Sequence, residues 1–165
     1  MNSVAFVEER VLFSPNLPRE VNNLLQAAVA ASSVDQSLAE VLFLQAQTLD
    51  SQCLQTYFAL YKFYFFQKRL ADAERIVLAG LEESAKQGGF PNDVEQLVQD
   101  LPAWHLVSNE NALFYCYTLK ALSFIKLRLG LTQDALLVLA HLRQLDPEDL
   151  SGASVIMDLA AGISE

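Results

Sequence analysis

The sequence has few charged residues and no long apolar run without charge. Charged side chains make up 19% of its 165 residues, and hydrophobic ones 52%. Its two longest apolar stretches, 57–66 and 113–131, are both interrupted by lysine or arginine. Neither offers the roughly 18 uncharged residues of a membrane-spanning helix, so no membrane span is predicted. The first ten residues lack the pattern of a signal peptide, and we expect a cytoplasmic protein.

Basic residues and cysteines are scarce as well. Eleven Lys and Arg against twenty Asp and Glu give a net charge of −9, which repels phosphate backbones and argues against a nucleic-acid partner. The two cysteines, Cys53 and Cys116, each stand among apolar and aromatic residues, and we interpret them as buried thiols in a reducing cytoplasm. A disulfide or a reactive thiol is the alternative. No set of residues at metal-ligand spacing surrounds either cysteine, so no metal site is predicted.

Groups that perform catalysis are also few. His141 lies within a predicted helix, where we interpret it as a partly exposed residue, and His105 follows Trp104 in a predicted loop. For His105 the alternative is a place at the edge of a binding surface. The chain contains no Gly-rich phosphate loop, no HExxH, no CxxC and no Gly-x-Ser-x-Gly motif. We therefore predict no catalytic residues, no cofactor and no enzymatic activity.

Only five prolines and six glycines interrupt the chain, and between them apolar residues recur every three or four positions. This is the period of an amphipathic helix, whereas strand-like alternation is nearly absent. We expect Gly88 to form a left-handed C-cap and Asn92 an N-cap. The pattern predicts an all-α fold with helices at 19–31, 35–49, 52–67, 70–87, 92–100, 109–129, 132–145 and 148–161.

Small residues recur in these helices with a fixed spacing. Ala39 and Ala73 are 34 residues apart, and Ala135 follows Ala73 by 62 residues, which is one such unit plus 28 further residues. A unit of this length cannot bury its apolar face alone, so about three units must stack on one another. The chain therefore divides into units at 20–53, 54–87 and 116–149.

These units resemble the tetratricopeptide repeat, a unit of about 34 residues built from two antiparallel helices with a small residue where they cross. The third unit matches best, because Gly130 stands at its turn, Ala135 at the crossing and Pro147 in its closing Leu-Asp-Pro segment. The resemblance implies helix hairpins stacked in a right-handed superhelix, and it covers roughly 100 residues. An irregular helical bundle is the alternative.

The predicted organisation is a single helical domain. The segment 88–115 is an insertion between the second and third units that carries four acids, the only tryptophan and no Lys or Arg. We expect it either to extend the neighbouring helices or to fold back as a lid. The final helix is expected to cover the end of the stack, with Asp149 and Asp158 on its outer side. In chain order the parts of 1–165 are an N-terminal segment (1–18), two repeats (19–87), the insertion (88–115), the third repeat (116–149) and a capping helix (150–165).

Aromatic residues concentrate at 57–66, where seven of the sixteen in the chain lie within ten residues. A helix buries one face, so these side chains cannot all point into one core. One stripe is expected to face a helical neighbour in the stack and holds Tyr57, Leu60, Tyr61 and Tyr64. The other stripe holds Phe58, Phe65 and Phe66, with Lys62 beside them.

The resemblance implies that the second stripe lines a concave groove for a partner peptide. Corresponding positions are Tyr117, Lys120, Phe124, Leu127 and Arg128 in the third unit and Val21, Leu24, Ala28, Ala31 and Ser32 in the first. One subgroup of the family binds a C-terminal carboxylate through Lys, Arg and Asn residues. Here Lys62 and Phe124 replace the asparagines, so that set is incomplete. The predicted groove consists of Phe58, Lys62, Phe65, Phe66, Tyr117, Lys120, Phe124 and Arg128.

We predict a protein–protein interaction module that holds an apolar or amphipathic segment of a partner, as an adaptor or small chaperone. Its size, acidity and three repeats are similar to those of small bacterial chaperones of secretion systems, although the insertion departs from them. Two alternatives are an assembly factor for an enzyme complex and a self-associating subunit whose homodimer interface is the aromatic patch. The aromatic residues could also pack against the insertion or against residues 1–16, and whether residues 1–16 occupy the groove stays open.

Overall fold

The computed structural model describes residues 17–164, and in this range it contains helices and no strands. The predicted all-α fold is therefore confirmed for the described residues. Residues 1–16, on which most of the predicted N-terminal segment falls, and Glu165 lie outside this range. No helix between residues 17 and 164 is long and apolar enough to cross a membrane. The helices are α2 (Arg19–Ala31), α3 (Gln36–Leu49), α4 (Leu54–Phe66), α5 (Leu70–Gly88), α6 (Val94–Gln99), α7 (Leu101–Trp104), α8 (Glu110–Arg128), α9 (Thr132–Leu145) and α10 (Ser154–Ser164).

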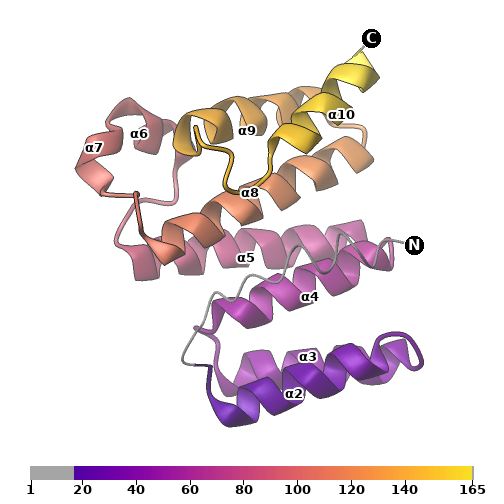
Figure 1. Cartoon of the computed structure of the whole chain (residues 1–165). Helices are drawn as coiled ribbons and strands as arrows, with labels where there is room; N and C mark the ends of the chain where they lie inside the picture. The colour runs from indigo at the N-terminus through magenta and orange to yellow at the C-terminus, as the bar shows by residue number, and fades with distance from the viewer. Residues whose placement is uncertain (1–16, 165) are drawn as a thin grey trace.

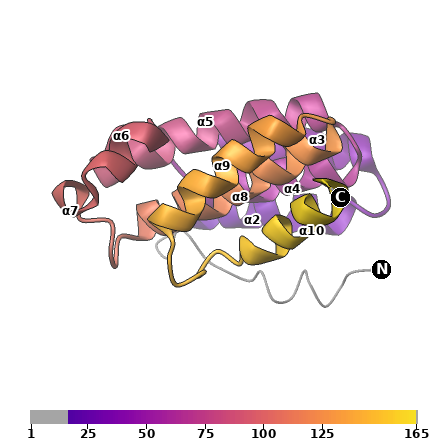
Figure 2. The same ribbon diagram turned by 90° about the horizontal axis from the view of Figure 1, so that it is seen from above.

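Six of these helices form three antiparallel hairpins, α2–α3, α4–α5 and α8–α9, which lie one above another (Figure 1). Ala39, Ala73 and Ala135, the residues that set the predicted period, are 0% exposed. Each lies near the start of the second helix of its hairpin, and a small buried side chain there lets the two helices pack closely. When the molecule is seen from above, α5 and α10 lie on opposite sides of it, α5 at the upper edge of the picture and α10 at the lower edge (Figure 2).

The turn between the two helices recurs in the second and third hairpins. Lys68 and Gly130, which are 62 residues apart, both have left-handed backbone angles, with φ of 62° and 80°. In each turn the following residue donates its N–H to a carbonyl in the last turn of the preceding helix, at 3.0 Å for Arg69 and 2.9 Å for Leu131. The same hydrogen bond therefore closes both helix ends.

Helix α5 ends one residue later than predicted. It continues through Gly88, and Gly89 takes the left-handed C-cap conformation, with φ of 74° and its N–H bonded to the carbonyl of Ala85. A Cβ atom on Gly88 would collide with the ring of Phe90. The two glycines therefore have separate roles, because the first leaves room for the ring and the second makes the left-handed turn.

The N-cap of α6 is Asp93 rather than the predicted Asn92. The Asp93 carboxylate accepts the backbone N–H groups of Glu95 and Gln96 at 3.1 and 3.2 Å. The Oδ1 atom of Asn92 instead accepts the hydroxyl proton of Tyr115 at 2.8 Å. Both residue types can cap a helix, and the contact with Tyr115 engages Asn92 elsewhere.

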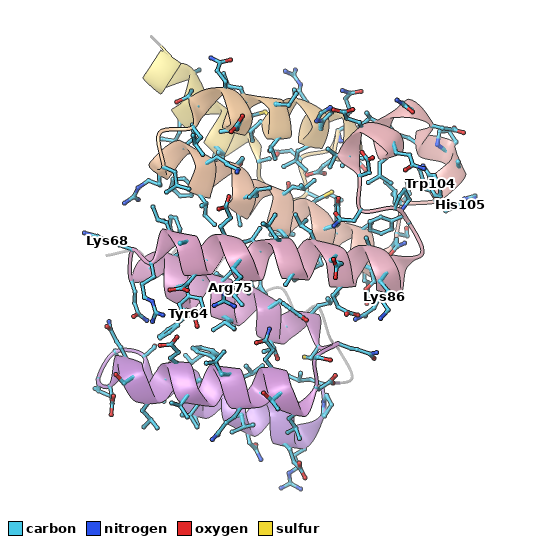
Figure 3. The ribbon with its side chains drawn as sticks, turned by 180° about the vertical axis from the view of Figure 1, so that it is seen from behind. Tyr64, Lys68, Arg75, Lys86, Trp104 and His105 are labelled. Atoms are coloured by element: carbon cyan, nitrogen blue, oxygen red, sulfur yellow. The ribbon has the colours of Figure 1, made fainter. Side chains whose placement is uncertain are left out.

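The segment 88–115 forms two short helices and also extends α8, and the extension of a neighbouring helix was one of the two expected outcomes. Its residues build α6, α7 and the first turns of α8, which begins before the predicted third unit with Asn109 as its N-cap. Leu97 of α6 is fully buried, and α6 packs on α9. Trp104 and His105 lie at the outer end of this segment (Figure 3). The segment therefore extends one end of the third hairpin.

Helix α10 begins at Ser154, whereas the sequence predicts a helix over 148–161. Two aspartates hold the intervening residues in a turn. Asp146 accepts two backbone N–H groups at 2.9 Å and the hydroxyl of Ser151 at 2.6 Å. Asp149, with a left-handed φ of 57°, accepts the N–H and the hydroxyl of Ser154 at 3.1 and 2.6 Å. These side-chain bonds replace helical ones, so Asp149 lies in a turn and not on the outer side of a helix.

A cluster of polar side chains joins the first two hairpins, and Tyr64 within it is labelled in Figure 3. Glu40 of α3 accepts hydrogen bonds from the Tyr64 hydroxyl at 2.7 Å and from two Arg69 nitrogens at 2.8 and 3.0 Å. Arg69 also donates to Asp72 at 2.9 Å. The hydrogen bonds from Arg69 and then Tyr64 lower the pKa of Glu40. Desolvation, with the bond to Glu40, raises the pKa of Tyr64 to about 12.

Candidate binding groove

A pocket of about 600 Å³ opens between α4, α8 and the segment 149–159. Helices α4 and α8 are the first helices of the second and third hairpins, so the stacking of these hairpins places them side by side. Helix α10 packs on α8 and α9. Together with the turn before it, α10 supplies the third wall.

The structure brings most of the predicted groove residues together. Those that line the pocket are Phe58, Lys62, Phe65 and Phe66 of α4 and Tyr117, Lys120 and Phe124 of α8. Arg128 does not line the pocket, but its guanidinium lies 5.8 Å from the centre of the Phe65 ring. The two helical stripes chosen from the sequence therefore face one site.

The floor of the pocket consists of aromatic rings that contact one another. Phe65 and Phe124, from different helices, have ring centres 5.1 Å apart, and Phe58 meets Tyr117 edge to face at 6.4 Å. These ring pairs tie α4 to α8. Exposure rises towards the rim, from 5% for Phe58 to 58% for Phe66. Phe66 therefore lies at the exposed rim, while Phe58 belongs to the floor.

Three cations stand over these rings. The Lys62 ammonium lies 4.6 Å from the centre of the Phe58 ring, and the Lys120 ammonium lies 5.0 Å from that of Tyr117. Arg128 is the third. Cation–π contacts of this kind hold positive charge at the groove of a chain whose net charge is −9. The groove is thus locally more cationic than the molecule as a whole.

The turn before α10 brings a carboxylate to the edge of the groove. Asp149 is the one acidic residue among the described residues that line the pocket. Hydrogen bonds from Ser154 lower the pKa of Asp149, and the charge of Lys120 contributes to the same effect. A Cβ atom on Gly152 would lie 3.9 Å from the Lys120 ammonium. The turn therefore runs beside Lys120 and places opposite charges at one edge.

The other stripe of α4 packs on neighbouring segments of the chain, but Tyr61, which was predicted to belong to this stripe alone, also lines the groove. Tyr64 reaches α3 through the polar cluster. The Tyr61 hydroxyl lies 3.4 Å from Thr118 Oγ1 of α8. Tyr57 donates its hydroxyl proton to the carbonyl of Ser51 at 2.7 Å. Helix α4 is consequently held on both sides, which fixes the direction of its groove stripe.

The prediction omitted the third wall of the groove and assigned one to the first hairpin. Val155, Ile156 and Leu159 of α10 line the pocket, and their spacing of one, three and four residues is that of an apolar stripe on a helix. None of the expected first-unit positions lines it, and Val21 and Ala28 are 1% and 0% exposed within the first hairpin. The groove is therefore built by the second and third hairpins and α10.

The other reactive side chains lie outside the groove. Cys53 and Cys116 are buried as predicted, and no disulfide joins them. Burial raises the pKa of Cys116 to about 12, which keeps it a thiol at neutral pH. His105 is exposed after α7, and His141 is half-buried within α9. Among residues 17–164, no group of three His, Cys, Asp or Glu side chains could hold a metal ion.

The recurring features of the chain are three helix hairpins, a buried alanine near the start of each second helix and a turn shared by the second and third hairpins. No family model, no curated protein and no solved structure matches the chain.

Proposed function

We propose that the protein is a non-enzymatic interaction module that holds an apolar or amphipathic segment of another protein in the groove between α4, α8 and α10. The observation that carries this proposal is the meeting of aromatic rings and cations in one open pocket, with Phe66 58% exposed at its rim. Clustered apolar surface in a concave site marks an interaction site. An adaptor or a small chaperone works through a site of this kind.

The groove favours a segment that combines apolar and acidic side chains. Apolar side chains would pack on Phe65, Phe66 and Phe124, because buried aromatic anchors contribute most to the binding energy of an interface. Acidic side chains would lie beside Lys62 and Lys120. A pocket of about 600 Å³ accommodates several side chains and not a folded domain. A short helix or an extended segment meets both conditions.

We also propose a class for the repeated hairpins and a cellular compartment for the protein. We take the three hairpins as degenerate tetratricopeptide-type repeats, supported by the buried alanines and by the turn that Lys68 and Gly130 share. Buried thiols at Cys53 and Cys116 without a disulfide between them support action in the cytoplasm. An assembly factor for an enzyme complex would use the same groove in the same way.

Affinity capture from a native lysate tests the proposal when wild type is compared with Phe66→Ser and Leu78→Ser. Leu78 is 50% exposed on α5 and does not line the groove, so it controls for the loss of an exposed apolar side chain. We expect a partner that wild type and Leu78→Ser retain and Phe66→Ser loses. A synthetic peptide from that partner should bind Phe66→Ser at least about tenfold more weakly, a loss of about 1.4 kcal/mol.

Circular dichroism and light scattering on all three proteins control for folding and mass. An identical set of partners for the three proteins would contradict the groove. A fall in mass confined to Phe66→Ser would instead identify the aromatic patch as a self-association interface.

A further inference from the structure

A second apolar surface lies on α3. Six exposed side chains along one side of this helix form what we call the α3 face: Leu38, Val41, Leu44, Gln45, Thr48 and Leu49. Val41 and Leu49 are each 50% exposed and Leu38 47%. With about 3.6 residues per turn, these positions fall opposite the buried side of the helix, which holds Ala39, Phe43 and Ala46. Five of the six line a shallow depression.

The corresponding surface of the second hairpin is charged. A step of 34 residues along the chain replaces the α3 face by Asp72, Arg75, Leu78, Ala79, Glu82 and Glu83 on α5. Only Leu78 repeats its counterpart, Leu44. The second helix of a hairpin can therefore carry charged residues where it faces water, as α5 does. Hairpin folding alone does not require the α3 face to be apolar. Contiguous apolar exposure of this kind marks an interaction surface.

We propose that a second copy of this chain docks on the α3 face, across a two-fold axis near Val41 and Gln45. The net charge of each copy is −9, so contacts between most surfaces of two copies bring like charges together. The α3 face carries no charged residue. Glu40, on the same helix, is engaged by Tyr64 and Arg69. An uncharged apolar face is complementary to itself, as a two-fold interface requires.

The dimension of the face agrees with a helix-on-helix contact. Helix α3 has 14 residues and is about 21 Å long. A contact between two such helices is at the small end of specific interfaces, so the dimer dissociates readily on dilution. No residue of α3 lines the groove. Self-association and occupation of the groove are consequently independent, and each can fail without the other.

Sedimentation velocity on the full chain, over a range of concentrations, tests this assignment with Leu44→Asp and Leu78→Asp. The two leucines occupy the same place in successive hairpins and are 37% and 50% exposed. For wild type and Leu78→Asp we expect the mass to rise from the 18.3 kDa of one chain towards twice that value. Leu44→Asp should raise the dissociation constant at least about tenfold, because a carboxylate would enter an apolar interface.

Cross-linking provides an independent readout. Under mild oxidation Gln45→Cys, which lies next to the proposed two-fold axis, should give a disulfide-linked dimer, whereas Glu82→Cys, at an exposed position on α5, should not. The native thiols are buried. Circular dichroism confirms that every variant is folded.

Three results would overturn the proposal. One is a wild-type protein that stays monomeric at every concentration, and slow maleimide labelling of Gln45→Cys in that monomer would assign the face to another part of the same chain. A second is a dimer that Leu44→Asp leaves intact. The third is an equal weakening by both aspartates. The last two results place the interface elsewhere.

Discussion

Lys68 has a backbone conformation that usually belongs to glycine. Its φ is 62°, and the equivalent residue of the third hairpin is Gly130, with φ of 80°. The left-handed region costs a residue with a Cβ atom roughly 1–2 kcal/mol. The turn forms nonetheless, because the packing of α4 on α5 requires the chain to reverse at this point. A single residue is therefore strained where tertiary structure outweighs local preference.

We expect Lys68→Gly to raise the free energy of unfolding by about 0.5–1 kcal/mol, because the relief of strain exceeds the entropy that glycine adds to the unfolded chain. Gly130→Ala, the opposite change in the equivalent turn, should lower it by about 1 kcal/mol. Urea denaturation at neutral pH measures both values. A less stable Lys68→Gly would show that the lysine side chain contributes more than its backbone strain removes.

At the scale of elements, α10 shows that side chains decide where a helix begins. The acceptors on Asp146 and Asp149 hold the preceding residues in a turn and deliver α10 to the groove. The position of this turn therefore sets the place of the third wall.

Asp146→Ala removes an acceptor of three hydrogen bonds, and we expect it to lower the free energy of unfolding by about 1–2 kcal/mol. The amides of α10 should also exchange faster with deuterium, as mass spectrometry can measure. Asp158→Ala, on the exposed side of α10, is the control and should change stability by less than about 0.5 kcal/mol. Equal exchange in the two variants would mean that packing on α8 and α9 alone holds α10.

The helices themselves were largely predictable, because their signals act over a few residues. Helices α2 and α9 begin and end where the sequence predicts. The cap of α6 and the start of α10 were not predictable, because Tyr115 engages Asn92 from a distant part of the chain and Asp146 competes with helical bonds. The groove stripes of α4 and α8 follow from helical spacing. The third wall depends on which side of α8 receives α10, and no local pattern encodes that choice.

At the scale of the whole molecule, the hairpins are not joined equally. Helices α5 and α8 pack extensively, whereas α3 and α4 meet over fewer residues. The junction between α3 and α4, which joins the first hairpin to the second, relies on the Phe43 and Phe63 rings, 5.0 Å apart, and on the polar cluster around Glu40. In a stack of hairpins the stability is the sum of the hairpins and of their junctions. The first hairpin therefore depends on a few side chains.

The stability that Glu40 provides should depend on pH. Hydrogen bonds from Arg69 and Tyr64 lower its pKa in the folded state from the usual 4.5, so the unfolded chain takes up the proton first as the pH falls. The stabilisation is complete above the unfolded pKa and is lost as the pH falls through the folded one. At neutral pH, Glu40→Gln should lower the free energy of unfolding by about 1 kcal/mol, a value reduced for the partial exposure of the pair.

Urea denaturation at several pH values measures this effect. The difference between wild type and Glu40→Gln should shrink as the pH falls below 4.5, the usual pKa of this carboxyl. Glu82→Gln, an exposed glutamate on α5, is the control and should show no such trend. A difference that stays constant with pH would contradict the role of the Glu40 charge.

The place of the only tryptophan has an optical consequence. Trp104 is in α7, and no residue of the segment 88–115 lines the groove. Its emission therefore follows the folding of that end of the molecule and is insensitive to an occupant of the groove. Folding and binding can then be monitored separately in one sample, with tryptophan emission for the first and a fluorophore on the peptide for the second.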